Sequence, residues 1–181
     1  MKRHIILIIF CLMILTSQAQ VTNSSYVNNY GEKVLQLSII VPLDKMAAWE
    51  LFTTDEGLKK WIAPVAKIDM KVGGSIITNY DKTKTIEDST SIKLDIINYI
   101  QQELLTLKVN LNNNFPPSTI REDKNLQEVI QFISAGKGRT KIVSNMIGWG
   151  HGSDWDKVYA FFEKGNTWTY EEVLKLFKKQ Q

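Results

Sequence analysis

The sequence predicts an α+β domain in which an antiparallel sheet is followed by a C-terminal helix. Between residues 65 and 149 apolar and polar residues alternate, which is typical of strands, and no helical pattern separates those strands. After residue 150 the apolar residues recur every three or four positions, as on one face of a helix. Strands that follow one another without intervening helices form an antiparallel sheet.

Residues 1–19 have the pattern of a cleavable secretory signal. Lys2 and Arg3 precede an apolar run from Ile5 to Leu15, and small residues follow where a signal peptidase cuts. The run is about half of the ~20 residues that a membrane-spanning helix needs. Cys11 is the only cysteine and would leave with the signal. We therefore expect a periplasmic or secreted protein without disulfides and without stable membrane insertion after cleavage.

The remaining chain has the size and charge of one ordinary domain. It contains 162 residues with 20 basic and 19 acidic side chains, and no basic stripe that would indicate nucleic-acid binding. His151 is its only histidine, which argues against a metal site built from histidine and cysteine. We predict no metal, no cofactor and no nucleic-acid partner, and the sequence names no protein partner.

The first half of this domain predicts one strand and two short helices. An alternating apolar stretch ends at Pro42, and helix-forming residues follow from Asp44, which is available as a cap. A second helical pattern stops before Pro64. The expected elements are a flexible leader at 20–31 and, within a domain spanning 32–181, a strand at 34–41 and helices at 44–52 and 55–62.

The middle of the chain predicts a series of strands joined by turns and loops. The turn Val72-Gly73-Gly74 separates two short strands, and the segment from Ala135 to Arg139 connects two others as a hairpin. Asp81–Ser91 is a charged loop, and Asn112–Asn125 is expected to be a long polar loop. The expected strands are 65–70, 75–80, 92–96, 105–111, 128–134 and 140–147.

The last predicted element begins after the glycine-rich segment Gly148–Gly152. An apolar helix face is formed by Trp155, Val158, Tyr159 and Phe162, and a second one by Tyr170, Val173, Leu174 and Phe177. Gly165-Asn166 separates the two faces and predicts either one kinked helix or two consecutive helices. Ser153 with Asp156, and Thr169 with Glu172, have the spacing of helix caps.

Four segments follow one another along the chain: Val41–Thr54, Leu58–Trp61, Val72–Gly74 and Gly148–Trp155. In this order they resemble the START-like SRPBCC superfamily, in particular its activator-of-heat-shock-ATPase-homologue-like branch. The resemblance covers about residues 33–177 and implies the helix-grip fold, a curved antiparallel sheet wrapped around a long C-terminal helix. It also implies an apolar cavity between sheet and helix that takes a hydrophobic small molecule or lipid. The predicted signal would make this chain an exported variant.

The predicted ligand-binding residues are aromatic. Trp149 and Trp155 would lie at the mouth of the implied cavity, and Tyr159 and Phe162 continue the same helix face inward. The predicted set is completed by Trp61 and Tyr80. Each of these side chains has the alternative of ordinary core packing.

The sequence contains no convincing catalytic group. His151, Ser153 and Asp154 are too close in sequence to form a hydrolase triad readily, and no nucleophile elbow is present. The glycines around His151 lack the Lys-Ser/Thr ending of a nucleotide-binding loop. The sequence therefore favours a binding protein for a hydrophobic ligand, with no catalytic residues assigned. The alternatives are a cyclase- or hydrolase-like enzyme acting through His151, Tyr159 or Tyr80, and a protein-interaction module with a filled core.

Overall fold

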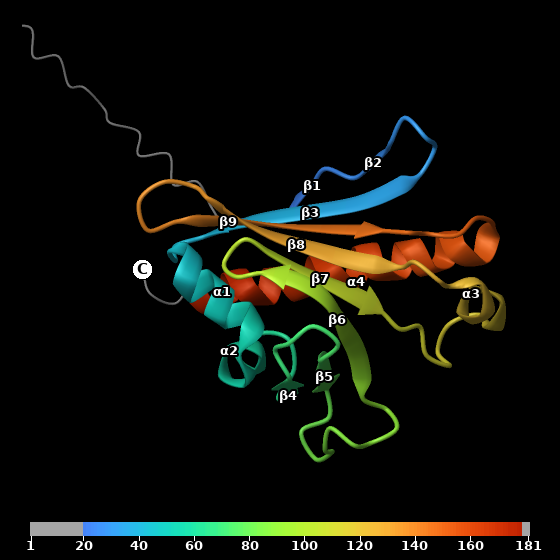
Figure 1. The fold of residues 1–181 in the computed structure, drawn as a ribbon, viewed down its shortest axis with the longest axis horizontal. Coiled ribbons are helices and arrows are strands. Elements are labelled where there is room, and N and C mark those ends of the chain that lie inside the picture. The colour runs from blue at the N-terminus through green and yellow to red at the C-terminus, as the bar shows by residue number, and fades with distance from the viewer. Residues whose placement is uncertain (1–19, 179–181) are drawn as a thin grey trace, which may run out of the picture.

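A computed structural model describes residues 20–178, which form an antiparallel sheet curved around a long helix (Figure 1). In chain order the elements are β1 (Thr22–Asn23), β2 (Tyr26–Val27), β3 (Lys33–Val41), α1 (Lys45–Thr53), α2 (Asp55–Lys59), β4 (Val65–Ile68), β5 (Ser75–Asn79), β6 (Ile92–Ile100), β7 (Leu104–Val109), α3 (Pro117–Glu122), β8 (Gln127–Ser134), β9 (Thr140–Ile147) and α4 (Ser153–Lys178). The predicted α+β helix-grip architecture is confirmed. The predicted signal at residues 1–19 lies outside the described residues.

The sheet follows the order β1-β3-β9-β8-β7-β6-β5-β4, and β2 also pairs with β3. Apart from the β3–β9 pairing and the two N-terminal strands, neighbours in the sheet are neighbours in the chain, joined by hairpins or loops. The pairing of β3 with β9 brings the N-terminal half of the domain beside its last strand, with Ile39 opposite Ile142. Helix α4 crosses the inner face of the curved sheet (Figure 1). The face beneath α4 is where the core and any cavity must lie.

The two short helices form as predicted because each begins at a capping side chain. Asp44 accepts a hydrogen bond from the backbone N–H of Ala47 at 2.9 Å, and Thr54 accepts one from Gly57 at 3.0 Å. Trp61 follows α2 and donates its indole N–H to the carbonyl of Leu51 at 3.0 Å. This bond ties the end of the second helix to the first.

The expectation of a flexible leader at residues 20–31 is wrong, because this segment pairs with β3. Thr22 lies opposite Ser38 and Tyr26 opposite Val34. Asn28 closes the following turn by accepting backbone N–H groups at 2.9 and 3.0 Å. Strands of two residues are too short to show an alternating pattern, and the segment 20–31 around them is rich in Asn and Ser.

The segment at 112–125 is also more ordered than a polar loop. It contains α3, and Phe115 packs its ring against Phe162 on α4 with centroids 5.6 Å apart. Thr119 on α3 is fully buried. A six-residue helix shows no repeating apolar face, so the pattern gave no indication of it.

Helix α4 is continuous through Gly165-Asn166, so of the two predicted alternatives that of two consecutive helices is wrong. Thr169 lies inside the helix and donates its hydroxyl to the carbonyl of Gly165 at 2.8 Å, so it caps no second helix. At the start of α4, Gly152 supplies the capping carbonyl, which accepts from the Asp156 backbone N–H at 3.0 Å. Ser153 is therefore the first helical residue rather than the cap. Packing of α4 on both sides of Gly165 outweighs the cost of about 1 kcal/mol that a glycine has inside a helix.

The glycines before α4 turn the chain from β9 into the helix. Gly148 (φ +82°) and Gly152 (φ +97°) both have left-handed backbone conformations. A Cβ on Gly148 would lie 2.0 Å from the backbone oxygen of Asn125, whereas a Cβ on Gly152 would meet nothing within 4 Å. Substitutions at the two positions therefore separate the cost of a left-handed backbone conformation from the cost of a clash with the Asn125 backbone oxygen.

We expect Gly148→Ala to be far more destabilising than Gly152→Ala. The second variant should lose about 1–2 kcal/mol of unfolding free energy for the left-handed conformation. The first adds a clash with a backbone carbonyl and should lose at least about 3 kcal/mol. Urea denaturation followed by tryptophan fluorescence measures both. Equal losses would show that the approach of Gly148 to Asn125 does not constrain the fold.

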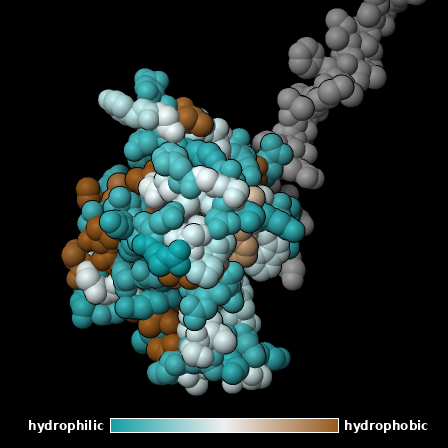
Figure 2. Space-filling view, turned by 90° about the vertical axis from the view of Figure 1, so that its right-hand side faces the viewer, coloured by the Kyte–Doolittle hydropathy of each residue, from teal (hydrophilic) through white to brown (hydrophobic). Residues whose placement is uncertain are grey.

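Hydrophobic surface is limited on the side of the molecule shown in Figure 2. Small groups of hydrophobic side chains are separated there by mostly hydrophilic ones (Figure 2). This face offers no broad apolar area of the kind that marks a large protein interface. Among residues 20–178, no helix combines the length and the apolar character that crossing a membrane requires.

Candidate functional site

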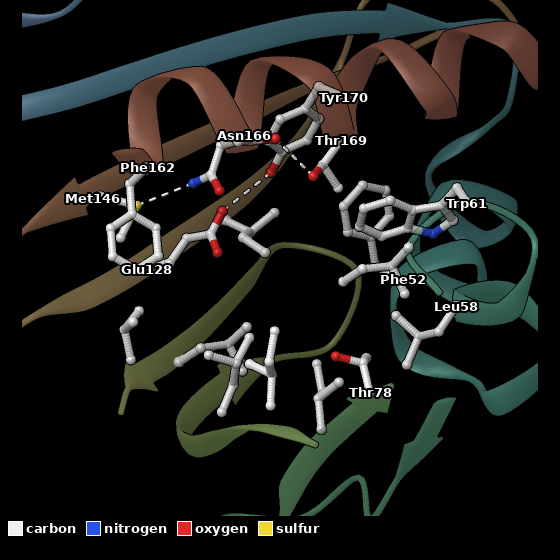
Figure 3. A pocket seen from close by; sticks show the side chains of 18 of the residues that line it. Phe52, Leu58, Trp61, Thr78, Glu128, Met146, Phe162, Asn166, Thr169 and Tyr170 are labelled. Carbon is white, nitrogen blue, oxygen red and sulfur yellow. Dashed lines mark hydrogen bonds between the residues drawn. The ribbon is translucent and has the colours of Figure 1, made fainter. Parts of the chain in front are cut away.

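A cavity of about 340 Å³ lies between the inner face of the sheet and the middle of α4. Strands β5 to β8 provide most of its apolar wall, and Phe52, Leu58 and Trp61 close the end near α1 and α2 (Figure 3). The apolar wall residues from the sheet are Ile76, Ile92, Leu94, Leu105, Leu107, Val109 and Ile130.

The cavity exists because small and polar residues replace large apolar ones on the inward face of α4. Before it, Trp155 and Val158 are buried, and after it Val173 and Leu174 are buried. Between Phe162 and Tyr170, which also line the cavity, the lining positions Gly165, Asn166 and Thr169 are small or polar. A Cβ on Gly165 would meet nothing within 4 Å. The break at residues 165–166 is thus a break in the apolar stripe and not in the helix.

Three exposed aromatic residues line the cavity where it meets the surface. Phe161 and Trp168 on α4 are 60% and 48% exposed, and Tyr80 after β5 is 51% exposed. Positions 161, 165 and 168 follow the helical spacing of one face, so Gly165 lies between the two α4 aromatics. We call Tyr80, Phe161 and Trp168 the aromatic rim. Gly165 keeps the space between its members open.

A small polar cluster interrupts the apolar wall. The Glu128 carboxyl on β8 accepts hydrogen bonds from the Ser144 hydroxyl on β9 at 2.6 Å and from the Tyr170 hydroxyl on α4 at 3.3 Å. Both bonds go to the same oxygen, Oε1. Figure 3 shows the second carboxyl oxygen turned away from Tyr170 toward the open space. Asn166 lies next to this cluster and donates to the Met146 sulfur at 3.0 Å.

Burial dominates the electrostatics of this cluster. Desolvation raises the pKa of Glu128, and the hydrogen bonds from Ser144 and Tyr170 only partly oppose it. Burial also raises the pKa of Tyr170 well above its ordinary value, and the adjacent Glu128 charge raises it further. Across residues 20–178, no lysine, arginine or histidine forms an ion pair with Glu128.

The structure gathers three of the six predicted ligand-binding residues around the cavity. Phe162 and Trp61 line its interior and Tyr80 belongs to the aromatic rim. Their contact with a ligand stays a prediction.

The other three predicted residues lie around the start of α4, away from the cavity lining. Trp155 is buried and donates its indole N–H to Glu122 of α3 at 2.9 Å. Trp149 donates to the backbone oxygen of Met146 at 3.0 Å, and its ring lies 4.9 Å from that of Tyr159. The cavity begins only at Phe161, so the glycine-rich entry to the helix is not its mouth. These three aromatics build the junction between β9, α3 and α4.

Of the three residues named for the enzyme alternative, His151 and Tyr159 lie outside the cavity lining, whereas Tyr80 belongs to it. His151 is exposed near the helix start, and Asp154 accepts from Ser118 and Lys157 rather than from the histidine. Tyr159 packs against Trp149 outside the cavity. In the described chain, no three His, Cys, Asp or Glu side chains gather closely enough to hold a metal ion.

The polar cluster was missed at the sequence level, although the strands contain an indication of it. Glu128 occupies the same alternating positions as Ile130 and Phe132, which point into the core. Ser144 alternates in the same way with Ile142 and Met146. A carboxyl on the inward face of a strand is expensive unless it has a partner or a role.

Comparison with known proteins identifies the fold. No protein family and no curated protein sequence matches the chain significantly. Among solved structures, protein MLL2253 from Mesorhizobium loti has a TM-score of 0.63 at 13% identity, covering 82% of this chain and 98% of that one. The Aha1 dimer from Colwellia psychrerythraea gives 0.54 at 16% identity, with 79% and 90% covered. PFC0360w, an Hsp90 activator from Plasmodium falciparum, gives 0.56 at 14% identity, with 80% and 94% covered. The Aha1-like helix-grip fold expected from the sequence is therefore confirmed.

Proposed function

We propose that this protein binds a small, mainly hydrophobic molecule or a single lipid chain in the cavity beneath α4. The cavity itself carries this proposal. Its volume of about 340 Å³ falls at the lower end of the range of small-molecule sites, about 300–1,000 Å³. Its wall is mostly apolar with a few convergent polar groups, which is the usual composition of such sites. Burying apolar ligand surface would contribute roughly 25 cal/mol per Å².

The two alternative functions have less support. A protein-interaction module with a filled core is less supported, because the space under α4 is open and is not filled by side chains. An enzyme acting through His151, Tyr159 or Tyr80 would require the acting side chain in the cavity, and of these three only Tyr80 lines it, at the exposed rim. The sequence pattern of residues 1–19 is the basis for our further proposal that the protein acts in the periplasm or outside the cell.

Filling the gap between the rim aromatics should block binding without unfolding the protein. Gly165→Leu places a large side chain where a Cβ meets nothing within 4 Å, so we expect N-phenyl-1-naphthylamine, a neutral apolar probe, to bind at least about tenfold more weakly. Gly165→Ala is the matched control, because it leaves most of the space and should raise the unfolding free energy by about 0.5–1 kcal/mol. Fluorescence titration measures binding, and thermal denaturation measures stability.

The outcomes of this experiment separate the hypotheses. If the wild-type protein binds no apolar probe and native mass spectrometry finds no co-purified ligand, the binding function is refuted. If the probe binds equally to wild type and Gly165→Leu, the binding site lies elsewhere on the protein.

A further inference from the structure

Glu128 places a carboxyl group without a cationic partner in a mainly apolar cavity. An ionised carboxylate in such surroundings is costly unless a cation and hydrogen bonds compensate it. Two hydroxyl donors, Ser144 and Tyr170, both bind Oε1. The other carboxyl oxygen, Oε2, forms no hydrogen bond. Every fully buried side-chain nitrogen or oxygen in the described chain does form one, so Oε2 is not fully buried and is open to the cavity.

The polar and basic side chains near Glu128 form their hydrogen bonds and ion pairs with other groups. The Asn166 amide donates to the sulfur of Met146, and the Thr169 hydroxyl donates to the backbone oxygen of Gly165. Lys108 lies on the neighbouring strand β7, but it pairs with Asp123 at 2.6 Å. The protein therefore provides two neutral donors for Glu128 and leaves the counter-charge to be supplied from outside.

Aromatic rings line the same cavity as the carboxyl and are suited to a cation. The Tyr170 ring is stacked with those of Phe52 and Trp61, with centroids 6.3 and 6.4 Å apart. Phe162, about two helical turns before Tyr170 on α4, lines the same cavity. Ammonium groups are attracted to the faces of such rings and to carboxylates together.

We propose that the ligand is an apolar molecule bearing one protonated amino group, which pairs with Glu128 Oε2 while the apolar part fills the cavity. This inference rests on the proposed function, because it specifies the class of molecule that the same cavity takes. A neutral or anionic head group would leave the carboxylate without a counter-ion.

Three ligands that share one alkyl chain test the inference. Decylamine, 1-decanol and decanoate, each below its aggregation concentration, are titrated calorimetrically into wild type, Glu128→Gln and Glu172→Gln. Wild type should bind decylamine at least about tenfold more tightly than 1-decanol, and decanoate most weakly. Glu128→Gln should remove the preference for the amine and leave 1-decanol within about threefold. Glu172→Gln is the control, because it makes the same carboxyl-to-amide change on α4 outside the cavity lining and should not affect the preference.

Each outcome bears on a different claim. Equal binding of amine and alcohol to wild type, or tighter binding of decanoate, overturns the inference while the binding function stands. An amine preference that persists in Glu128→Gln overturns it as well. If none of the three ligands binds wild type, the binding function fails together with the inference. Because the head-group series in wild type is decisive alone, the test does not depend on the folding of a variant.

Discussion

Phe52→Ala should lower the free energy of unfolding by about 3–5 kcal/mol, the usual cost of removing a buried aromatic ring. Phe52 on α1 is 2% exposed and contacts three other aromatic rings. Its centroid lies 4.5 Å from that of Trp61, 5.5 Å from that of Phe132 and 6.3 Å from that of Tyr170. One side chain therefore joins the short helices, strand β8 and helix α4.

The cavity makes this substitution more costly than it would be in a solid core. Phe52 already lines the open space, so the void left by its ring would merge with the cavity. Surrounding residues collapse only partly around such voids, and the cost grows with the volume that stays empty.

Phe161→Ala is the matched control for the loss of a phenyl ring. Phe161 also lines the cavity but is 60% exposed, so we expect a loss below about 1 kcal/mol. Urea denaturation at neutral pH compares the two variants. Similar losses would mean that the aromatic cluster around Phe52 is not the connection between helices and sheet that the structure indicates.

The regular elements could be predicted from the sequence because their side chains repeat with the backbone period. Every second residue from Thr140 to Met146 is buried, and β9 has the predicted bounds of 140–147. The two-residue strands β1 and β2 could not be predicted because they are too short to alternate, and α3 could not because its six residues show no repeating apolar face. Their order comes from tertiary contacts, such as that of Phe115 with α4.

The candidate site was only half predictable for a related reason. The predicted ligand-binding residues were large aromatic ones, but a cavity forms where large side chains are missing. Gly165 and Asn166 mark that place, and their local propensity suggested a helix break instead. Whether the helix continues depends on the packing of Tyr170 and Val173 beyond them, which the local pattern does not contain.

Glu128→Gln should make the unliganded protein more stable at neutral pH and leave its stability almost unchanged at pH 4. Burial raises the pKa of Glu128 in the folded protein above that of the unfolded chain, about 4.3. Between these two pKa values the folded state binds more protons than the unfolded state. The free energy of unfolding of wild type therefore falls as pH rises through this interval, by up to about 1.4 kcal/mol per pH unit. Below it the carboxyl is protonated in both states and resembles the glutamine amide.

The difference between the two proteins isolates this group. Asp81, whose pKa is lowered by hydrogen bonds from the Thr83 backbone and hydroxyl, causes a loss of stability in acid, but it does so equally in both proteins. Urea denaturation from pH 4 to pH 9 should give unfolding free energies of wild type and Glu128→Gln that coincide at low pH and separate as pH rises. The gap becomes constant above the folded-state pKa of Glu128. A constant gap over the whole range would mean that Glu128 is hydrated like a surface carboxyl, and its need for a cationic ligand would then disappear. Adding decylamine to wild type at pH 7 should narrow the gap, because a ligand that binds only the folded state stabilises it.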